Sequence, residues 1–343
     1  MPNLNTVDVA NAIRNSASKE YQDRIPVANQ DNLKEISKLI TDYTPTFDEF
    51  TGVLLNRIAK VLINTRHYEN PLAMLKRGKL EFGQVIEDVF VNIIKATEFN
   101  YNDQSDDNPF KRYTNDIKVA LYQLNEERQY GTTVSPDMVR TAFLSADGMN
   151  NLITIIVSKL YDSNQFDEFL ITKKLISEGV AQGYFKEITV PTLSAQTGNE
   201  TVKTMKNVID LMTFLGTDYN KQGVHTFTPI EDQIIICTPN FKNTLDVDVL
   251  AKAFNIDRVT FMSKMVVIDN FIEMDGVECV LLDKEMFQIW DNLIETTSIY
   301  NPKKLYTNYW LTLRQTFALS PFGNAVVFKS TEPATNCVTE PTT

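Results

Sequence analysis

The stretches VIEDVFVNII at Val85–Ile94 and IKVALYQL at Ile117–Leu124 decide how the middle of this sequence folds. The first is rich in β-branched residues and the second alternates between apolar and polar residues, and both patterns are typical of β-strands. Residues 102–109 between them are mostly Asn, Asp and Pro, which favour turns. The sequence therefore predicts a long hairpin with a polar tip.

The predicted tip carries charges of both signs, namely Asp103, Asp106, Asp107, Lys111 and Arg112. Charge pairs at the rim of an interface set its register more than its affinity. These five residues are therefore candidate inter-subunit contacts. A solvated loop explains the same charges and is slightly favoured by sequence alone. A divalent-ion site is less favoured, because the Gly and the distal Glu of a calcium loop are missing.

The sequence before the hairpin divides into a polar part and an amphipathic part. Residues 1–24 are polar and weakly periodic, which indicates either an arm that becomes ordered only on another surface or a frayed terminus. Asp31–Tyr43 and Thr46–Asn64 show helical spacing of apolar residues. Thr46 and Glu49 have the spacing of a capping box, so we expect the second helix to begin there.

The sequence after the hairpin predicts two helices. A Gly-containing break is expected at Gln129–Thr133. A short helix is expected from Ser135 to Phe143, because Ser suits the N-cap and Pro suits the first helical position. Helical spacing then continues from Asp147 to Gly179, which predicts a rod of roughly 45 Å. Asp162–Asn164 is a polar cluster at which this rod could bend.

Beyond Val180 the pattern becomes mixed α/β. Two helices are expected, at Glu200–Leu215 and Asp246–Phe254, and the tail Thr331–Thr343 is expected to be disordered. Large aromatic residues of the last third, Trp290, Trp310, Tyr300, Tyr306 and Tyr309, are expected in the core or at an interface. The strand candidates are Gln233–Cys237, Val259–Ile268, Glu278–Leu282 and Asn324–Phe328.

Composition argues against several functional classes. The 343 residues have a net charge of −11, with 33 basic against 44 acidic residues, which disfavours a protein that grips nucleic acid. No apolar run is long enough for a membrane span, and no secretory signal is present. His67 and His225 lie apart from other metal ligands, and phosphate-binding and nucleophile motifs are missing. The sequence predicts no catalytic residue, cofactor or metal.

Several phrases resemble the major head proteins of small podoviruses of the Picovirinae-like group. They include NPLAMLK at Asn70–Lys76, FDEFL at Phe166–Leu170, LAKAFN at Leu250–Asn255 and SPFGNAVVF at Ser320–Phe328. The resemblance covers most of the chain, and none of these phrases is a catalytic signature. It implies an α+β fold of the Hong Kong 97 type.

The resemblance implies a subunit that assembles with copies of itself into hexamers and pentamers of an icosahedral shell around double-stranded DNA. It also implies a scaffolding protein and a portal as partners, no membrane, and assembly in the host cytoplasm. The implied parts are an N-terminal arm with helices (1–77), an extended loop (78–133), a peripheral domain with a spine helix (134–180), an axial domain (181–300), a return segment (301–330) and a tail (331–343).

Three rival functions remain at this point. An encapsulin-like compartment shell has the same fold, but the sequence lacks a sign of a cargo-binding groove. A portal or another virion protein would assemble as a single ring. An intracellular α/β enzyme fits the mixed region after Val180 but lacks a visible catalytic motif.

Overall fold

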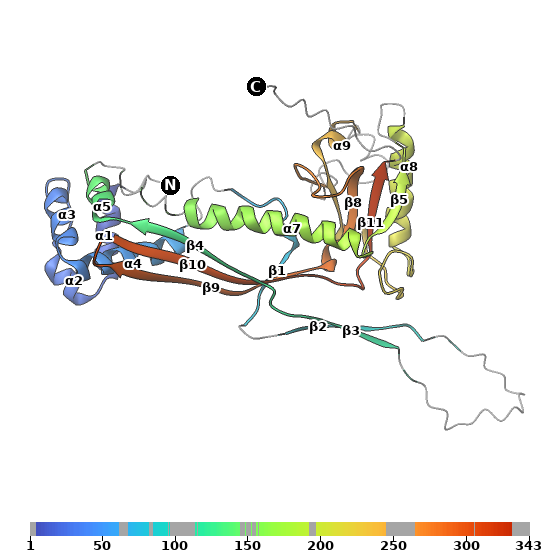
Figure 1. Cartoon of the computed structure of the whole chain (residues 1–343), viewed down its shortest axis with the longest axis horizontal. Helices are drawn as coiled ribbons and strands as arrows, with labels where there is room; N and C mark the ends of the chain where they lie inside the picture. The colour runs from blue at the N-terminus through green and yellow to red at the C-terminus, as the bar shows by residue number, and fades with distance from the viewer. Residues whose placement is uncertain are drawn as a thin grey trace, which may run out of the picture. The chain divides into compact units, whose positions relative to one another are not determined.

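The computed structural model describes residues 5–61, 68–81, 85–94, 96, 114, 116–144, 148, 152, 156, 158–191, 197–244, 265–304 and 306–330 (Figure 1). The chain forms two compact units. Unit 1 comprises Met1–Asn70, Glu126–Glu168 and Leu293–Arg314. Unit 2 comprises Pro71–Asn125, Phe169–Asn292 and Gln315–Thr343.

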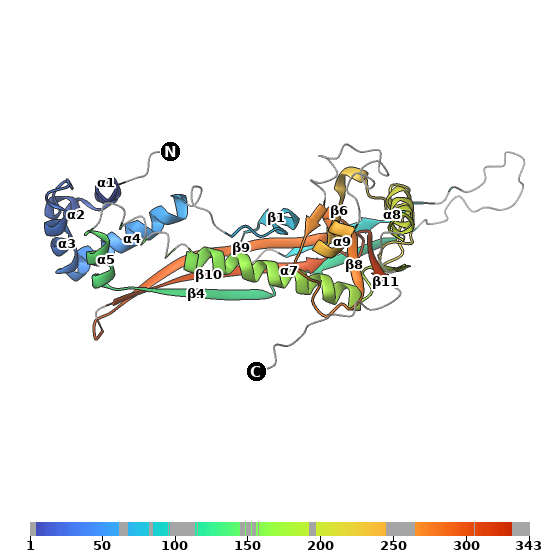
Figure 2. The same cartoon turned by 90° about the horizontal axis from the view of Figure 1, so that it is seen from above.

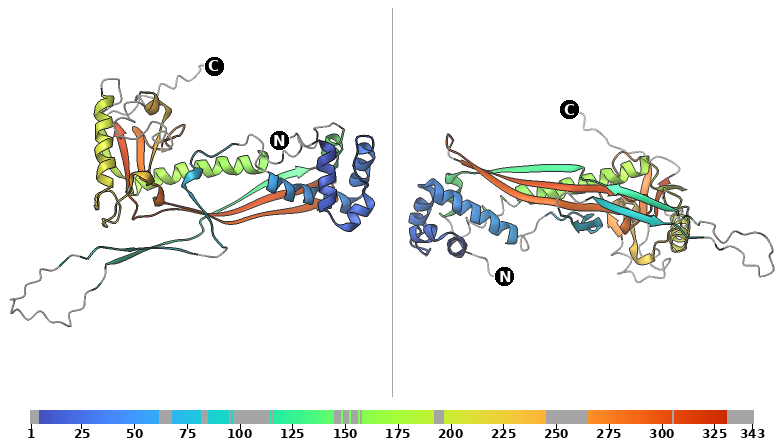
Figure 3. Two further views of the ribbon diagram at one scale, coloured as in Figure 1. Left: turned by 180° about the vertical axis from the view of Figure 1, so that it is seen from behind. Right: turned by 90° about the horizontal axis from the view of Figure 1, so that it is seen from below.

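Unit 1 contains the helices of the N-terminal region, which appear in blue in Figure 3 together with the green α5. The side chains of Val9, Ile13 and Tyr21 are buried in its core. The expectation of an arm without its own core is therefore wrong for residues 5–24. The helices are α1 (Thr6–Ser16), α2 (Lys19–Arg24), α3 (Leu33–Thr41), α4 (Thr44–Val61) and α5 (Pro136–Ala142).

The predicted helices before and after the hairpin are confirmed as α3, α4 and α5. The capping box is wrong, because α4 begins at Thr44 and places Thr46 inside the helix. Glu49 instead accepts hydrogen bonds from the backbone N and Oγ of Ser18, at 2.5 and 3.0 Å. Ser135 caps α5 as predicted, since its side chain accepts from the backbone N of Met138.

Three long strands form the sheet of unit 1, in which β4 (Glu126–Val134) lies beside β10 (Tyr306–Leu319), and β10 lies beside β9 (Phe287–Asn301) (Figure 2). β9 and β10 also have residues in unit 2. The break expected at Gln129–Thr133 is wrong, because β4 runs through it. Gly131 serves close packing there: a Cβ on it would lie 3.3 Å from the Trp310 ring.

Unit 2 is built on a five-stranded sheet in which strand order is β5-β11-β8-β6-β7. Alternate residues of β6 and β8 belong to two separate apolar clusters, so both faces of this sheet are buried. The helix α8 (Gly198–Met212) confirms the helix expected at Glu200–Leu215, and five of its apolar residues pack on one face of the sheet, namely Val202, Met205, Val208, Ile209 and Met212. The strands are β5 (Lys186–Val190), β6 (Gln233–Cys237), β7 (Met265–Val267), β8 (Val277–Asp283) and β11 (Ala325–Ser330), and α9 (Pro239–Thr244) follows β6.

The predicted rod is confirmed over the helix α7 (Ser163–Ala181), which is preceded by a π-helical turn at Ser158–Asp162. The polar cluster at Asp162–Asn164 thus marks the change between two helix types. Gly179 does not end α7. A Cβ on Gly179 would contact Leu319 and would lie 2.7 Å from Phe185, so glycine is needed for packing, and Gly183 has the positive φ of 75°.

The predicted hairpin is confirmed by β2 (Ile86–Val91), which pairs antiparallel with β3 (Ile117–Tyr122). Figure 1 shows the two strands side by side. β1 (Lys76–Lys79) pairs in parallel with β9 in unit 2. Short 3-10 helices lie at Ala73–Leu75, Ile230–Asp232 and Lys284–Met286.

Two expectations fall outside the described residues, the helix at Asp246–Phe254 and the disordered tail at Thr331–Thr343. Within the part of the chain that the structure describes, no helix is long and apolar enough to span a membrane.

Candidate functional site at the hairpin root

The β2–β3 hairpin has one exposed apolar face, which we call the outer face. It consists of Val89, Val91, Ile117, Val119 and Leu121, and each of these side chains is between 53% and 58% exposed. The register places Val89 opposite Val119 and Val91 opposite Ile117. A two-stranded hairpin is marginally stable alone, and contiguous exposed apolar residues mark interaction surfaces. The outer face is therefore a candidate contact with another chain.

The opposite face of the hairpin carries Asp88, which accepts one hydrogen bond within the hairpin and one from the rest of unit 2. Its Oδ2 accepts a hydrogen bond from Tyr122 Oη at 3.1 Å and from Ser320 Oγ at 2.6 Å. Phe90 stacks on Phe322, with 5.4 Å between ring centroids. Burial raises the pKa of the Tyr122 hydroxyl above its ordinary value, so it remains a donor to Asp88. These contacts form the first part of the hairpin root.

A turn of unit 2 provides the second part of the hairpin root. Nδ1 of His225 lies 3.0 Å from Oδ1 of Asn92, at the end of β2. Nζ of Lys118 donates to the carbonyl oxygen of Gln222 at 2.8 Å. Both strands of the hairpin are thus tied to the same turn, which fixes the direction in which the hairpin leaves unit 2.

Asn125 completes the hairpin root just after β3. Its Nδ2 donates to the carbonyl oxygen of Phe317, and its Oδ1 accepts from the backbone N of Phe317, both at 2.8 Å. The Asn125 amide thereby forms, at the end of β10, the two backbone hydrogen bonds that a neighbouring strand would otherwise form. An open cavity of about 310 Å³ lies beside the root and is lined by residues that include Leu121, Tyr122 and Leu175.

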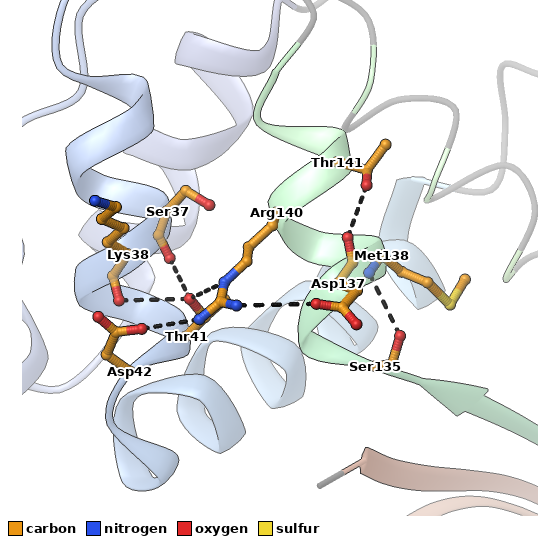
Figure 4. A network of polar contacts seen from close by, with 9 residues as sticks. All are labelled: Ser37, Lys38, Thr41, Asp42, Ser135, Asp137, Met138, Arg140 and Thr141. Carbon is orange, nitrogen blue, oxygen red and sulfur yellow. Dashed lines mark hydrogen bonds and ion pairs between the residues drawn. The ribbon is translucent and has the colours of Figure 1, made fainter.

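Unit 1 contains a separate polar cluster around Arg140, shown in Figure 4. Arg140 donates from Nε to Thr41 Oγ1 and from Nη2 to Asp42 Oδ1, both at 2.9 Å, and its Nη1 lies 3.8 Å from Asp137. The cluster joins α5 to the end of α3. Because Arg140, Asp42 and Asp137 are exposed, it stabilises local packing and does not form a closed reaction site.

The predicted contacts Asp103, Asp106, Asp107, Lys111 and Arg112 lie outside the described residues, as does His67. They stay a prediction. The hairpin root was missed by sequence reasoning, since Asp88, Asn92 and Ser320 are ordinary polar residues in sequence. The only signal was the phrase SPFGNAVVF, which contains Ser320 and Phe322 but indicates no contact with β2.

Cys237 and Cys279 of unit 2 are buried, as is common for free cysteines, which behave as small apolar residues. Burial raises the pKa of Cys237 to about 12 and raises that of Cys279 well above its ordinary value. Neither thiol is therefore activated as a nucleophile. Across the ranges that the structure describes, no three His, Cys, Asp or Glu side chains are grouped to bind a metal ion.

Comparisons with known proteins agree on one family. Residues 10–329 match the family described as Phi29-like phage major capsid protein. The major capsid protein of Bacillus phage B103 is 34% identical over 94% of this chain and 72% of its own length. That of Streptococcus phage Cp-1 is 28% identical over 94% of this chain and 93% of its own length.

Solved structures agree on the fold. The capsid structure of Staphylococcus phage Andhra matches with a TM-score of 0.65 and 14% identity, over 78% of this chain and 86% of that chain. The capsid structure of cyanophage P-SCSP1u matches with a TM-score of 0.54 and 7% identity, over 78% and 90%. The fold is thus an α+β phage capsid fold of the Hong Kong 97 type, as the resemblance implied.

Proposed function

This chain belongs to the Phi29-like phage major capsid protein family, and we propose that its hairpin joins neighbouring subunits into a closed shell. The capsid role itself follows from the family. Hexamers and pentamers of an icosahedral shell around double-stranded DNA are the finer proposal. The observation that supports it is a hairpin with a fixed root and an exposed apolar outer face.

The two faces of the hairpin have different roles in this proposal. Its inner face is occupied by the hairpin root, so its direction is set within each subunit before assembly. Its outer face exposes five aliphatic side chains to water, and burial of each stabilises an interface by about 1 kcal/mol or more. Many copies of such a contact, closed by symmetry, make a strong shell from modest interactions.

The charged residues between β2 and β3 would contact groups of opposite charge on a neighbouring copy. Asp103, Asp106 and Asp107 are acidic, and Lys303 and Lys304 form an exposed basic turn between β9 and β10. Oδ1 of Asn301 accepts from the backbone N of both lysines, at 3.1 and 3.3 Å, which fixes this turn. Lys111 and Arg112 would meet acidic groups in the same way.

The remaining parts would follow the division that the resemblance implies. Residues 78–133 would be the extended loop, 134–180 the peripheral domain, 181–300 the axial domain and 301–330 the return segment. A scaffolding protein and a portal would guide assembly in the host cytoplasm, and the net charge of −11 suits a wall that does not grip DNA. No catalytic step is needed for this role.

The test compares shells from wild type with shells from Val119→Asp and from Val119→Ile. Full-length chain is expressed alone and with the other head proteins of the phage, and particles are counted by electron microscopy. Val119→Asp should lower the shell yield at least 10-fold, because a charge enters the apolar interface. Val119→Ile should assemble as wild type.

Folding is the control in this test. Val119 is 56% exposed, so both variants should keep the free energy of unfolding within about 1 kcal/mol of wild type. Wild-type chain that stays monomeric, or that forms only rings of fixed number, would contradict the proposal. Normal shells from Val119→Asp would exclude the outer face as the contact.

A further inference from the structure

The second half of β9 is unusual because it is exposed on both faces. Residues 294–299 are all exposed, with Ile294 at 44% and Ile299 at 60%. In the neighbouring β10, alternate residues from Thr307 to Leu313 are buried. The core of unit 1 therefore covers β10 but not this part of β9, which runs to the turn before β10 (Figure 2).

The outer side of this segment is also an open edge of the sheet. β9 lies between β1 and β10 in the strand order, but its pairing with β1 covers only Ile289–Asp291. The last bond on that side joins the backbone N of Leu80 to the carbonyl oxygen of Asp291 at 2.8 Å. Among the described residues, no strand pairs with Leu293–Ile299 on that side. We call Leu293–Ile299 the open edge.

Backbone alternation tells which groups the open edge presents. The N–H and C=O of one residue point to the same side of a strand, and successive residues point to opposite sides. Because the carbonyl of Asp291 points toward β1, those of Leu293, Glu295, Thr297 and Ile299 point to the open edge. The intervening residues point toward β10.

The open edge lacks the usual protection against pairing with another chain. Proteins block exposed edges with Lys, Pro, bulges or a covering segment. The sequence LIETTSI of Leu293–Ile299 contains neither Lys nor Pro, and its one charge is Glu295. β-branched residues dominate it, and these favour strands. Such an edge is suited to accept an added strand.

We infer that the open edge binds the β2–β3 hairpin of a second copy of this chain by strand addition. This inference rests on the proposed function, in which the hairpin overlaps a neighbour. The hairpin strands are six residues long and the open edge is seven, so the lengths match. Among the described residues, β2 and β3 pair only with each other, so the free edge of either strand can pair with the unpaired edge of a sheet.

Charge favours the same occupant. The basic turn with Lys303 and Lys304 follows the open edge directly, and both lysines are exposed. A second copy has 11 more acidic than basic residues, and its hairpin connection contains Asp103, Asp106 and Asp107. The sheet of β4, β10 and β9 would thus be extended by the two strands of the neighbour.

The first test removes one backbone donor from the open edge. Thr297→Pro deletes an N–H that points outward, and proline is tolerated on an edge strand when its missing N–H faces solvent. Thr297→Val is the matched control, because it keeps the N–H and the β-branched shape. Thr297→Pro should give at least 10-fold fewer shells than Thr297→Val. Equal yields would overturn the inference.

Hydrogen exchange on wild-type protein tests the same contact without a substitution that could affect folding. The amides of Leu293, Glu295, Thr297 and Ile299 should exchange fast in unassembled subunits and at least 10-fold more slowly in shells. The amides of Ile294, Thr296 and Ser298 should be slow in both. Fast exchange of the outward amides in closed shells would overturn the inference and leave the proposed function intact, whereas absence of any shell would overturn the proposed function.

Cross-linking identifies the occupant. Benzoylphenylalanine in place of Thr297 is photoactivated in assembled shells, and the cross-linked peptide is identified by mass spectrometry. The inference requires a peptide from residues 85–122 of another copy. A peptide from any other segment would show that a different strand occupies the open edge and would overturn this assignment.

Discussion

At the scale of single residues, Asp88 ties the hairpin to the rest of unit 2, because one carboxylate oxygen accepts from Tyr122 on the paired strand and from Ser320 outside the hairpin. Asp88→Ala would leave the buried Tyr122 hydroxyl without this acceptor. We expect a loss of about 1–3 kcal/mol in the free energy of unfolding, measured in urea. The hairpin amides should also exchange faster. Asp88→Asn keeps an acceptor oxygen and should lose less.

The matched control for Asp88 lies next to it on the same strand. Glu87 is exposed and belongs to the other side of the hairpin. Glu87→Ala should therefore change the free energy of unfolding by less than about 0.5 kcal/mol. If Asp88→Ala were as silent as Glu87→Ala, the hairpin root would not depend on Asp88.

Lys173 is a second residue with a specific role in stability, because its charged side chain is only 2% exposed within unit 2. Its Nζ lies 2.6 Å from Asp269 Oδ1 and 2.5 Å from Asn270 Oδ1. Burial alone would raise the pKa of Asp269, but the hydrogen bond and charge of Lys173 outweigh burial and lower it. The pair therefore stabilises the fold above pH ~4, the ordinary pKa of Asp, and the stabilisation is lost as pH falls through the lowered pKa.

The Lys173–Asp269 pair should make the free energy of unfolding depend on pH. Asp269→Ala should cost about 1–2 kcal/mol at pH 7, a modest value because Asp269 is largely exposed. The difference from wild type should vanish at pH values below the lowered pKa. Lys173→Met should cost less than Asp269→Ala, because it leaves no buried charge behind. A difference from wild type that is the same at pH 7 and at pH 2 would contradict the ion pair.

At the scale of elements, replacing glycine by alanine should have opposite effects on stability in two of the helices. A Cβ on Gly179 of α7 would lie 2.7 Å from Phe185, whereas a Cβ on Gly52 of α4 would meet nothing within 4 Å. Gly179→Ala should destabilise by about 1–3 kcal/mol through overpacking. Gly52→Ala should stabilise by up to about 1 kcal/mol through helix propensity. Thermal unfolding of both variants checks the pair, and stabilisation by Gly179→Ala would contradict the packing seen here.

The helix α8 and the strand β6 were predictable because one physical pattern decides each of them. α8 has a clean helical period, and β6 is five buried residues in a row. β9 and β10 were not predicted as strands. β10 buries Thr307, Gln315 and Thr316 among its apolar residues, so alternation of polarity is hidden, and the second half of β9 faces no core. The open edge could therefore be recognised only in the structure.

At the scale of the whole molecule, the fold type and the family could be recognised from family-like phrases in the sequence, whereas most of the contacts proposed to build a shell could not. The hairpin was predictable from Val85–Ile94 and Ile117–Leu124. Its root was not, because Asn92 and His225 are 133 residues apart in sequence. Long-range pairs of ordinary polar residues leave no local signal, and the N-terminal helices were misjudged because their apolar residues are few.

The proposed assembly depends most on where the hairpin of one copy lies in the closed shell. Cryo-electron microscopy of closed wild-type shells would locate it directly. We expect each hairpin to lie on an adjacent subunit, with Val89, Val119 and Leu121 buried. One of its strands should pair with the open edge, Leu293–Ile299, of the neighbour's β9. A closed shell in which the outer face stays exposed to solvent, or lies on its own subunit, would contradict the account.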